Sequence, residues 1–305
     1  MIYTLTLNPA VDMSVTAPTL LPNVTTRTEN MLLSPNGKGV NVAFVLRRLG
    51  QPAGVLGFFG GFTGRYIVES CEAAGIVTCP TEVAGDTRVN VLLTADSAEY
   101  KMVNAGPTVT PDDEARLLAT IAALPDLDVL TVNGSTARGC APDFYDRLIA
   151  TAKGKGAEVV LDISTPELRG LLSHKPLLIK PNDEELKSIF GLEIDDEASV
   201  RAALSKLFQM GAQNILLTLG SRGSYFYNGR DLYQCGTYPV KLVNSWCTGD
   251  GCLAAFLSRW LSDRTDVAGA LRLAAATGAS IAESVGIGTL ENVWHYEPQI
   301  AVERI

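Results

Sequence analysis

Hydrophobic and polar residues follow two periods that alternate along this chain. Short apolar runs of the kind that form buried strands are followed by stretches with helical spacing. The pattern predicts strands at 2–7, 53–59, 129–132, 159–161 and 177–179, and helices at 40–49, 65–74, 111–124 and 253–261. This order predicts an α/β fold in which helices cover both faces of a mostly parallel sheet.

Residues at the ends of the expected helices support these boundaries. Gly50 and Gly75 each follow a helical stretch, where glycine is the common residue after the last turn. Thr110 is suited to cap the helix that starts at Pro111, and proline fits the first helical position.

Two stretches interrupt the alternation of strands and helices. Residues 14–33 and 87–104 have strand character with no helix between successive runs, which predicts an antiparallel flap at the edge of the sheet. We interpret these stretches, about 12–33 and 87–104, as a small lid. No internal repeat or linker divides the chain, so one domain over 1–305 is expected.

Composition excludes several classes of protein. Hydrophobic residues make up 47% of the 305 residues and charged ones 19%, which is typical of a globular protein with a large core. With 25 basic and 33 acidic residues the net charge is −8, which argues against nucleic acid as a main partner. Small anions remain possible ligands, because helix N-termini bind phosphate whatever the net charge.

Cysteine spacing and hydropathy limit which metal sites and which cellular location are expected. The six cysteines include no CxxC pair and the two histidines lie far from any cysteine cluster, so a zinc site is not expected. The first residues lack the pattern of a secretory signal, and no uncharged run is long enough for a membrane span. We therefore expect a reduced, cytoplasmic protein.

Two common nucleotide-binding motifs are absent. The glycines around Lys38 and Lys155 do not form the GxxxxGK[ST] sequence of a P-loop. The residues after the first strand contain no glycine, so the GxGxxG fingerprint of a dinucleotide-binding enzyme is missing.

Glycine-rich segments at 34–39 and 57–64 precede two of the expected helices, those at 40–49 and 65–74. Gly37, Lys38 and Asn41 lie where one helix begins, so free backbone N–H groups and a cation favour an anion there. Asp12 follows the first strand, at the edge where open α/β sheets bind ligands. An ordinary glycine-rich turn explains either segment equally well when it is taken alone.

The loop 244–252 leads into the last predicted helix. Amides at this helix start would create a second anion site, and Asp250 among them could accept a proton from an attacking hydroxyl. From spacing alone, a simple helix-capping role for Asp250 is the more common alternative.

Taken in order, the motifs NPAVD, NGKGVNVA, GFFGGFTG, TRVN, KPNDEEL, TLGSRG and a late GD before a helix cover essentially the whole chain. This combination resembles the PfkB (ribokinase-like) carbohydrate kinases, and within them the branch of 1-phosphofructokinases and tagatose-6-phosphate kinases. The resemblance implies a three-layer αβα sandwich with a small β-sheet lid. It also implies an ATP- and Mg²⁺-dependent kinase for a phosphorylated ketohexose, and two lids that clasp each other in a homodimer.

The resemblance assigns roles to individual positions. Asp250 looks like the general base, with the amides around Cys247, Thr248 and Gly249 as an anion hole for the transferring phosphoryl group. The residues expected to bind the sugar phosphate are Asp12, Arg27, Gly37, Lys38, Asn41, Arg88, Asn90 and Ser135. Those expected on the ATP side are Lys180, Asn182, Thr218, Gly220, Gly223 and Gly249, with Glu185 acting on Mg²⁺ indirectly.

The chain departs from the family pattern near the expected site. Cys247 and Thr248 replace two small residues of the motif GAGD, and Asn36 stands where glycine is usual. Fructose 1-phosphate is the first choice of substrate and tagatose 6-phosphate the second. The alternatives are another sugar kinase of this family and a sugar-phosphate or nucleotide sensor with weakened catalysis. Asp250, Asn182 and Glu185 favour the enzyme, because a sensor needs no base.

Overall fold

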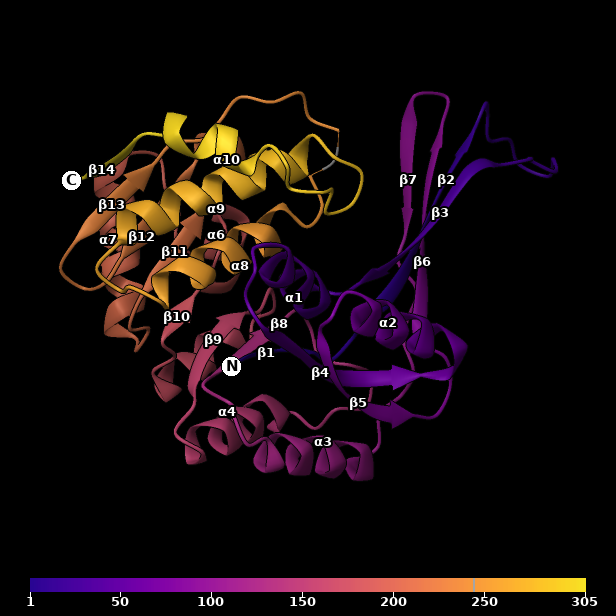
Figure 1. Ribbon diagram of the computed structural model, residues 1–305, viewed down its shortest axis with the longest axis horizontal. Helices are drawn as coiled ribbons and strands as arrows, with labels where there is room; N and C mark the ends of the chain where they lie inside the picture. The colour runs from indigo at the N-terminus through magenta and orange to yellow at the C-terminus, as the bar shows by residue number, and fades with distance from the viewer. Residues whose placement is uncertain (244) are drawn as a thin grey trace.

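The computed structural model describes residues 1–243 and 245–305, so Asn244, which belongs to the loop motif before the last predicted helix, lies outside the described residues. A large sheet with the strand order β14-β13-β12-β11-β10-β9-β8-β1-β4-β5 runs through the molecule (Figure 1). Its strands are β1 (Ile2–Thr6), β4 (Ala53–Gly60), β5 (Val77–Val83), β8 (Val129–Asn133), β9 (Glu158–Asp162), β10 (Leu178–Ile179), β11 (Ile215–Thr218), β12 (Ser224–Tyr227), β13 (Leu232–Cys235) and β14 (Val302–Arg304).

The part of this sheet from β5 to β11 is parallel, and β11 to β14 form an antiparallel meander. All residues of β4 and β8 are buried, because parallel strands are covered by helices on both faces. The chain pattern predicted β1, β4, β8, β9 and β10 to within about two residues, but it predicted neither β5 and β11 nor the meander.

Helices form a layer on each side of the sheet (Figure 1). One hydrophobic core contains side chains of α3 (Pro111–Ala123), α4 (Phe144–Gly154), α5 (Leu168–Leu171), α6 (Asp183–Phe190) and α7 (Glu197–Gln209). The other contains side chains of α1 (Lys38–Arg48), α2 (Gly61–Ala73), α8 (Thr248–Trp260), α9 (Val267–Ala282) and α10 (Val293–Tyr296). The predicted three-layer αβα sandwich is therefore confirmed.

The predicted helix boundaries hold closely, with two exceptions, the starts of α2 and of α8, which begins at Thr248 rather than at the predicted Leu253. Helix α3 has the expected cap, in which the Thr110 hydroxyl accepts from the Asp113 N–H and Pro111 occupies the first position. Helix α2 begins at Gly61, four residues before the predicted start at Arg65, because the glycine-rich segment joins the first turn. Short 3₁₀ turns lie at 172–174, 220–222 and 297–299. In the described part of the chain, no helix is long and apolar enough to cross a membrane.

A second, smaller sheet projects from the large one (Figure 1). It contains β2 (Ala10–Ala17), β3 (Glu29–Asn36), β6 (Arg88–Ala95) and β7 (Ala98–Met102) in the order β3-β2-β6-β7. The expected flap is antiparallel within each hairpin, but its central pair β2–β6 is parallel, so the prediction of a fully antiparallel flap is wrong. The reason is that β2 and β6 both leave the large sheet in the same direction.

Candidate active site

The polar side chains singled out by the sequence gather where the small sheet meets the carboxyl ends of the large one. Asp12 lies on β2, Lys38 and Asn41 on the first turns of α1, and Asp250 on the first turn of α8. Helices α1 and α8 pack against each other, which places Asn41 and Asp250 in contact although they are 209 positions apart.

Asp250 is buried, and its carboxylate accepts a hydrogen bond from the Asn41 Nδ2 atom at 2.9 Å. Burial and the nearby charge of Asp162 raise the pKa of Asp250 to about 6, although Lys38, Asn41 and Lys180 oppose the shift. A carboxyl group with this pKa is ionised at neutral pH and remains basic enough to accept a proton.

Two lysines and one aspartate form a charged cluster next to Asp250. The Oδ1 atom of the fully buried Asp162 lies 3.1 Å from the Lys38 Nζ atom and 3.2 Å from the Lys180 Nζ atom. Burial would raise the pKa of Asp162, but the two ammonium groups hold it below its usual range. Burial would lower the pKa of Lys38, but the carboxylates of Asp162, Asp250 and Glu185 outweigh it and raise the pKa. Lys38 therefore stays charged beside the candidate base.

Asp12 and its neighbours form a polar group on the small sheet. The Asp12 carboxylate accepts from the Asn90 Nδ2 atom at 2.9 Å and from the Asn36 Nδ2 atom. Burial raises the pKa of Asp12, while the bonds from Asn90 and Asn36 and the charge of Arg88 oppose this. The Asn90 Oδ1 atom is buried with no partner in the described part of the chain, so it can accept a hydrogen bond from a ligand hydroxyl.

Arg88 and Arg27 are placed differently. Arg88 is half-buried at the base of the small sheet, and its guanidinium donates to the carbonyls of Asn8, Pro9 and Asn104 at 3.0 to 3.4 Å. Arg27 is exposed in the loop between β2 and β3, and this loop lies at the end of the small sheet that points away from α8 (Figure 1). One copy of the chain therefore brings Arg88 to the site, but not Arg27.

Ser135 and the residues expected on the ATP side lie at the ends of the neighbouring strands. Ser135 follows Gly134, where a Cβ atom would lie 3.9 Å from the Lys38 side chain. Asn182 and Glu185 form a reciprocal cap at the start of α6, with bonds of 2.7 and 3.0 Å, and Asn182 also bridges to Thr218. Glu185 approaches the Lys38 Nζ atom to 4.0 Å, which joins this group to the charged cluster.

Gly220 and Gly223 flank the turn after β11, both with positive φ angles, 57° and 86°. A Cβ atom at Gly223 would meet the Cys235 carbonyl oxygen at 2.1 Å, so glycine is required for the packing of this turn. A role of these two glycines at a nucleotide remains a prediction.

The loop before α8 contains Cys247 and the helix starts at Thr248, the two residues that differ from the family motif GAGD. Cys247 has φ 62° and ψ −6°, a left-handed conformation that glycine adopts without strain. Gly37, at the matching position before α1, has φ 134°. Thr248 turns its hydroxyl back to the Ser245 carbonyl at 2.9 Å, away from the first N–H groups of the helix. The amides at 248 and 249 thus keep a helix-start arrangement despite the two larger residues.

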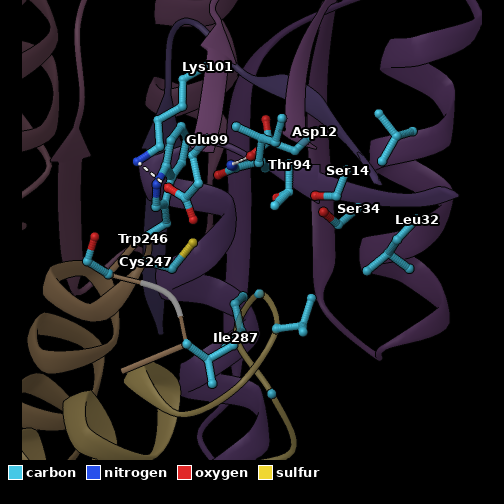
Figure 2. A pocket seen from close by; sticks show the side chains of 18 of the residues that line it. Asp12, Ser14, Leu32, Ser34, Thr94, Glu99, Lys101, Trp246, Cys247 and Ile287 are labelled. Atoms are coloured by element: carbon cyan, nitrogen blue, oxygen red, sulfur yellow. Dashed lines mark hydrogen bonds and ion pairs between the residues drawn. The ribbon is translucent and has the colours of Figure 1, made fainter. Parts of the chain in front are cut away.

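A cavity of about 860 Å³ separates the small sheet from the loops before α8 and after α9. Figure 2 shows Asp12, Ser14 and Thr94 on the side of the small sheet, with Cys247 and Ile287 on the opposite side. The Lys101 ammonium lies 4.8 Å above the Trp246 ring and 3.3 Å from Glu99, so β7 contacts the loop that leads to Asp250. The cavity is large enough for a sugar phosphate.

Two residues of the site, Asp162 and Asn36, were not predicted from the sequence. Asp162 ends the buried run Glu158–Asp162, and a charged residue closing an apolar strand is a signal that could have identified it. Asn36 was noted only as a departure from a family pattern, whereas the structure places its amide between Asp12 and Asn41. No local pattern reveals such a bridge, because Asn36, Asp12 and Asn41 belong to three different elements.

Comparisons with known proteins agree with this geometry. A model of the pfkB family carbohydrate kinases matches residues 5–293. Over 305 residues the chain is 42% identical to D-tagatose-1-phosphate kinase of Klebsiella oxytoca, with 100% of each chain covered. It is 34% identical over 306 residues to 1-phosphofructokinase of Bacillus subtilis, again with 100% of each chain covered.

Among solved structures, phosphofructokinase-2 of Escherichia coli is similar with a TM-score of 0.88, 24% identity and coverage of 97% of this chain and 99% of that one, which supports the fold. The chain therefore belongs to the pfkB family of carbohydrate kinases. The predicted class of enzyme, a sugar-phosphate kinase, is confirmed, and the family implies ATP as the phosphoryl donor.

Proposed function

We propose that this enzyme transfers the γ-phosphoryl group of ATP to the free primary hydroxyl of a ketohexose 1-phosphate, giving a ketohexose 1,6-bisphosphate. The observation that carries the proposal is the buried Asp250 carboxyl, ionisable near pH 6 and flanked by Lys38 and Lys180 at the start of α8. A base beside fixed cations is the arrangement that phosphoryl transfer to a hydroxyl requires.

The choice of a 1-phosphate rests on the names of the relatives. Both curated relatives described above are named for 1-phosphate substrates, one of tagatose and one of fructose. The two sugars differ only in configuration at C4, so one site can be shaped for either. Fructose 1-phosphate, the first choice from sequence, stays in this class, and D-tagatose 1-phosphate replaces tagatose 6-phosphate as the second candidate.

The site residues form two groups, those that bind the sugar phosphate and those that act on the transferring phosphoryl group. Asp12 and Asn90 bind sugar hydroxyls from the small sheet, and Arg88 with Ser135 binds the phosphate of the substrate. Asp250 takes the proton of the attacking hydroxyl. Lys38 was expected at the sugar phosphate, but its contact with Asp162 and Glu185 favours a role beside Lys180 in neutralising the transferring group. Amides at 248 and 249 complete that role.

The ATP side fits a magnesium ion held mainly by the nucleotide. The Asp162 Oδ2 atom is buried with no partner in the described part of the chain, and Glu185 lies close by. The described residues contain no cluster of three ligating side chains, which agrees with Mg²⁺ held by phosphates and one or two carboxylates. When bound, this ion would neutralise phosphate charge. Asn182, Thr218, Gly220 and Gly223 frame the proposed nucleotide site.

The function is tested by a coupled ADP-release assay with ATP and a panel of sugars. The panel contains D-fructose 1-phosphate, D-tagatose 1-phosphate, the two 6-phosphates and the unphosphorylated sugars. We expect kcat/KM to be highest for a 1-phosphate. Turnover of the 6-phosphates alone would contradict the proposed substrate class, and ADP release with none of the sugars would favour the sensor.

The pH dependence of turnover follows from the Asp250 pKa. Because the base must be ionised and its pKa is about 6, kcat should fall about tenfold for each pH unit below that value. The measurement is kcat between pH 5 and 9 at saturating substrates. Saturation matters because phosphate esters also titrate near pH 6. A kcat that stays constant down to pH 5 would contradict the assignment.

The small sheet is the proposed lid, within a single domain over 1–305, and we propose that two lids pair in a homodimer. Its edge strands β3 and β7 carry the exposed side chains Met31, Leu33 and Met102. Exposed apolar edges favour pairing. Pairing would also bring Arg27 of one copy to the site of the other.

We expect sedimentation to give a dimer at micromolar concentration, and Met31→Glu to shift it towards monomer. Trp294→Glu, at an exposed apolar residue on α10, is the control. A fully active wild-type monomer would refute the pairing.

A further inference from the structure

Five side chains form a continuous hydrogen-bonded chain from the small sheet to the candidate base. Asn90 and Asn36 both donate to the Asp12 carboxylate, one to each oxygen. Asn41 donates to the Asn36 Oδ1 atom at 2.8 Å and to the Asp250 Oδ2 atom at 2.9 Å. Among the described residues, Asn36 thus links the pair on the small sheet to the pair on the helices.

The chemistry of this link demands a residue that donates on one side and accepts on the other. The Asn36 Nδ2 group faces a carboxylate, and its Oδ1 atom faces the amide of Asn41 and the backbone N–H of Gly37. An asparagine side chain supplies both functions in a fixed plane, whereas aspartate lacks the donor and glycine lacks both.

Asn36 lies where the small sheet joins helix α1. Asn36 is the last residue of β3, and α1 begins two residues later, after Gly37. It is half-buried and lines the cavity together with Asp12, Asn41 and Cys247. Its side chain therefore connects the small sheet to helices α1 and α8, the second of which carries Asp250.

We propose that Asn36 is a positioning and specificity-determining residue, which fixes the Asp12 carboxylate for the sugar hydroxyls and, through Asn41, the orientation of Asp250. This inference rests on the proposed function. Because Asp12 is held at both oxygens, its acceptor directions are fixed and can distinguish sugars that differ in the configuration of one hydroxyl. Loss of the link should therefore weaken the discrimination between D-fructose and D-tagatose 1-phosphates.

Other charged or titratable groups face the two ends of this chain. Arg88 from β6 and Cys247 face Asp12; Lys38 from α1, Asp162 from β9, Lys180 after β10, and Cys247 and Cys252 around the start of α8 face Asp250. The variants below leave all of them in place, so a change in pH dependence reports on Asn36.

The first test is Asn36→Asp, which keeps the shape and the acceptor but replaces the donor towards Asp12. Two carboxyl groups within hydrogen-bond reach cannot both ionise freely. At high pH they should repel each other, so the Asp12 carboxylate should no longer be held in place for the sugar. We expect KM for the preferred sugar phosphate to rise about 10- to 100-fold at pH 8, the loss of a hydrogen bond to a charged group. At pH 5.5 the shared proton should restore the bond and shrink the defect, and KM for ATP should change less than about twofold.

The second variant, Asn36→Gly, removes donor and acceptor without charge. Asn41 then loses a partner, and its bond to the ionised form of Asp250 should weaken. Because that bond lowers the Asp250 pKa, the acid limb of the kcat profile should move to higher pH. The ratio of kcat/KM between the two 1-phosphates should also approach one. A role confined to folding would move neither quantity.

Asn292→Asp is the matched control, because the exposed Asn292 amide donates to the carboxylate of Glu283, the residue after α9, at 2.7 Å, and neither residue lines the cavity. It should leave both KM values unchanged. An unaltered sugar KM in Asn36→Asp, or an equal rise for ATP, would overturn the proposal.

If the wild-type enzyme releases no ADP with any sugar phosphate, the proposed function fails, and thermal unfolding then tests the link. Asn36→Asp should lower Tm more at pH 8 than at pH 5.5, and Asn292→Asp should show no such difference. Equal losses at both pH values in Asn36→Asp would overturn the link itself.

Discussion

Replacing Asp250 by asparagine should lower kcat about 10²- to 10⁴-fold while the KM values for ATP and the sugar phosphate change little. The substitution keeps the shape of the side chain and removes only its ability to accept a proton. Because burial already raises the Asp250 pKa, a neutral amide at this position costs the fold little. The measurement is steady-state ADP release with each substrate varied in turn.

The matched control is Asp112→Asn, an exposed carboxylate in the first turn of α3 that pairs with Arg116 at 3.3 Å. Both variants change one aspartate near a helix start, but only one changes the candidate base. An Asp250→Asn enzyme with kcat close to the wild-type value would remove the base assignment. A large rise in both KM values would instead identify Asp250 as a binding group.

Replacing Asp162 by asparagine should lower the free energy of unfolding by about 3 kcal/mol, the typical cost of leaving buried charges without their partner. The Asp162 Oδ1 atom balances both Lys38 and Lys180, of which Lys180 is buried. Activity should fall as well, because these two cations are the ones proposed to face the transferring group. Urea unfolding at pH 7 measures the stability, and the same preparation gives kcat.

The pH dependence of this loss has a definite sign. The Asp162 pKa is depressed in the folded protein, so its contribution is full above the unfolded value of about 4 and disappears as the pH falls through the lower folded value. The difference between wild type and Asp162→Asn should therefore not shrink between pH 7 and 5, where the lower charge beside Asp250 can only enlarge it, and it should disappear only in strong acid.

The control is Asp231→Asn, an aspartate that also contacts two cations, Arg230 and Arg304, both of which are exposed to water. Screening by water should make its loss much smaller than that of Asp162→Asn. Similar losses in the two variants would show that the buried cluster has no special role.

Local physics accounts for the parts of the fold that sequence predicted. The strand runs at β1, β4 and β8 and the caps of α3 depend on periodicity, on hydroxyl capping and on proline at a first turn, which act over a few residues. Motifs in order along the chain also sufficed to predict the kinase family and to single out Asp12, Lys38, Asn41 and Asp250.

The pairing of distant segments could not be predicted in this way. The parallel contact of β2 with β6 joins residues more than 70 positions apart, and the β11–β14 meander ends with the last residues of the chain. Such pairs are selected by the packing of whole layers, and nothing in a short window distinguishes a parallel from an antiparallel partner.

The amino-acid sequence by itself determined the class of fold, the boundaries of most central elements and the residue types of the candidate site, because each depends on neighbours along the chain. Only the tertiary structure decided that Asp162 lies under Lys38 and Lys180, that Arg88 is anchored by backbone carbonyls, and that Asn36 bridges Asp12 to Asn41. The physical reason is that pKa shifts and hydrogen bonds at this site arise between side chains of different elements, at distances that exist only after the layers have packed.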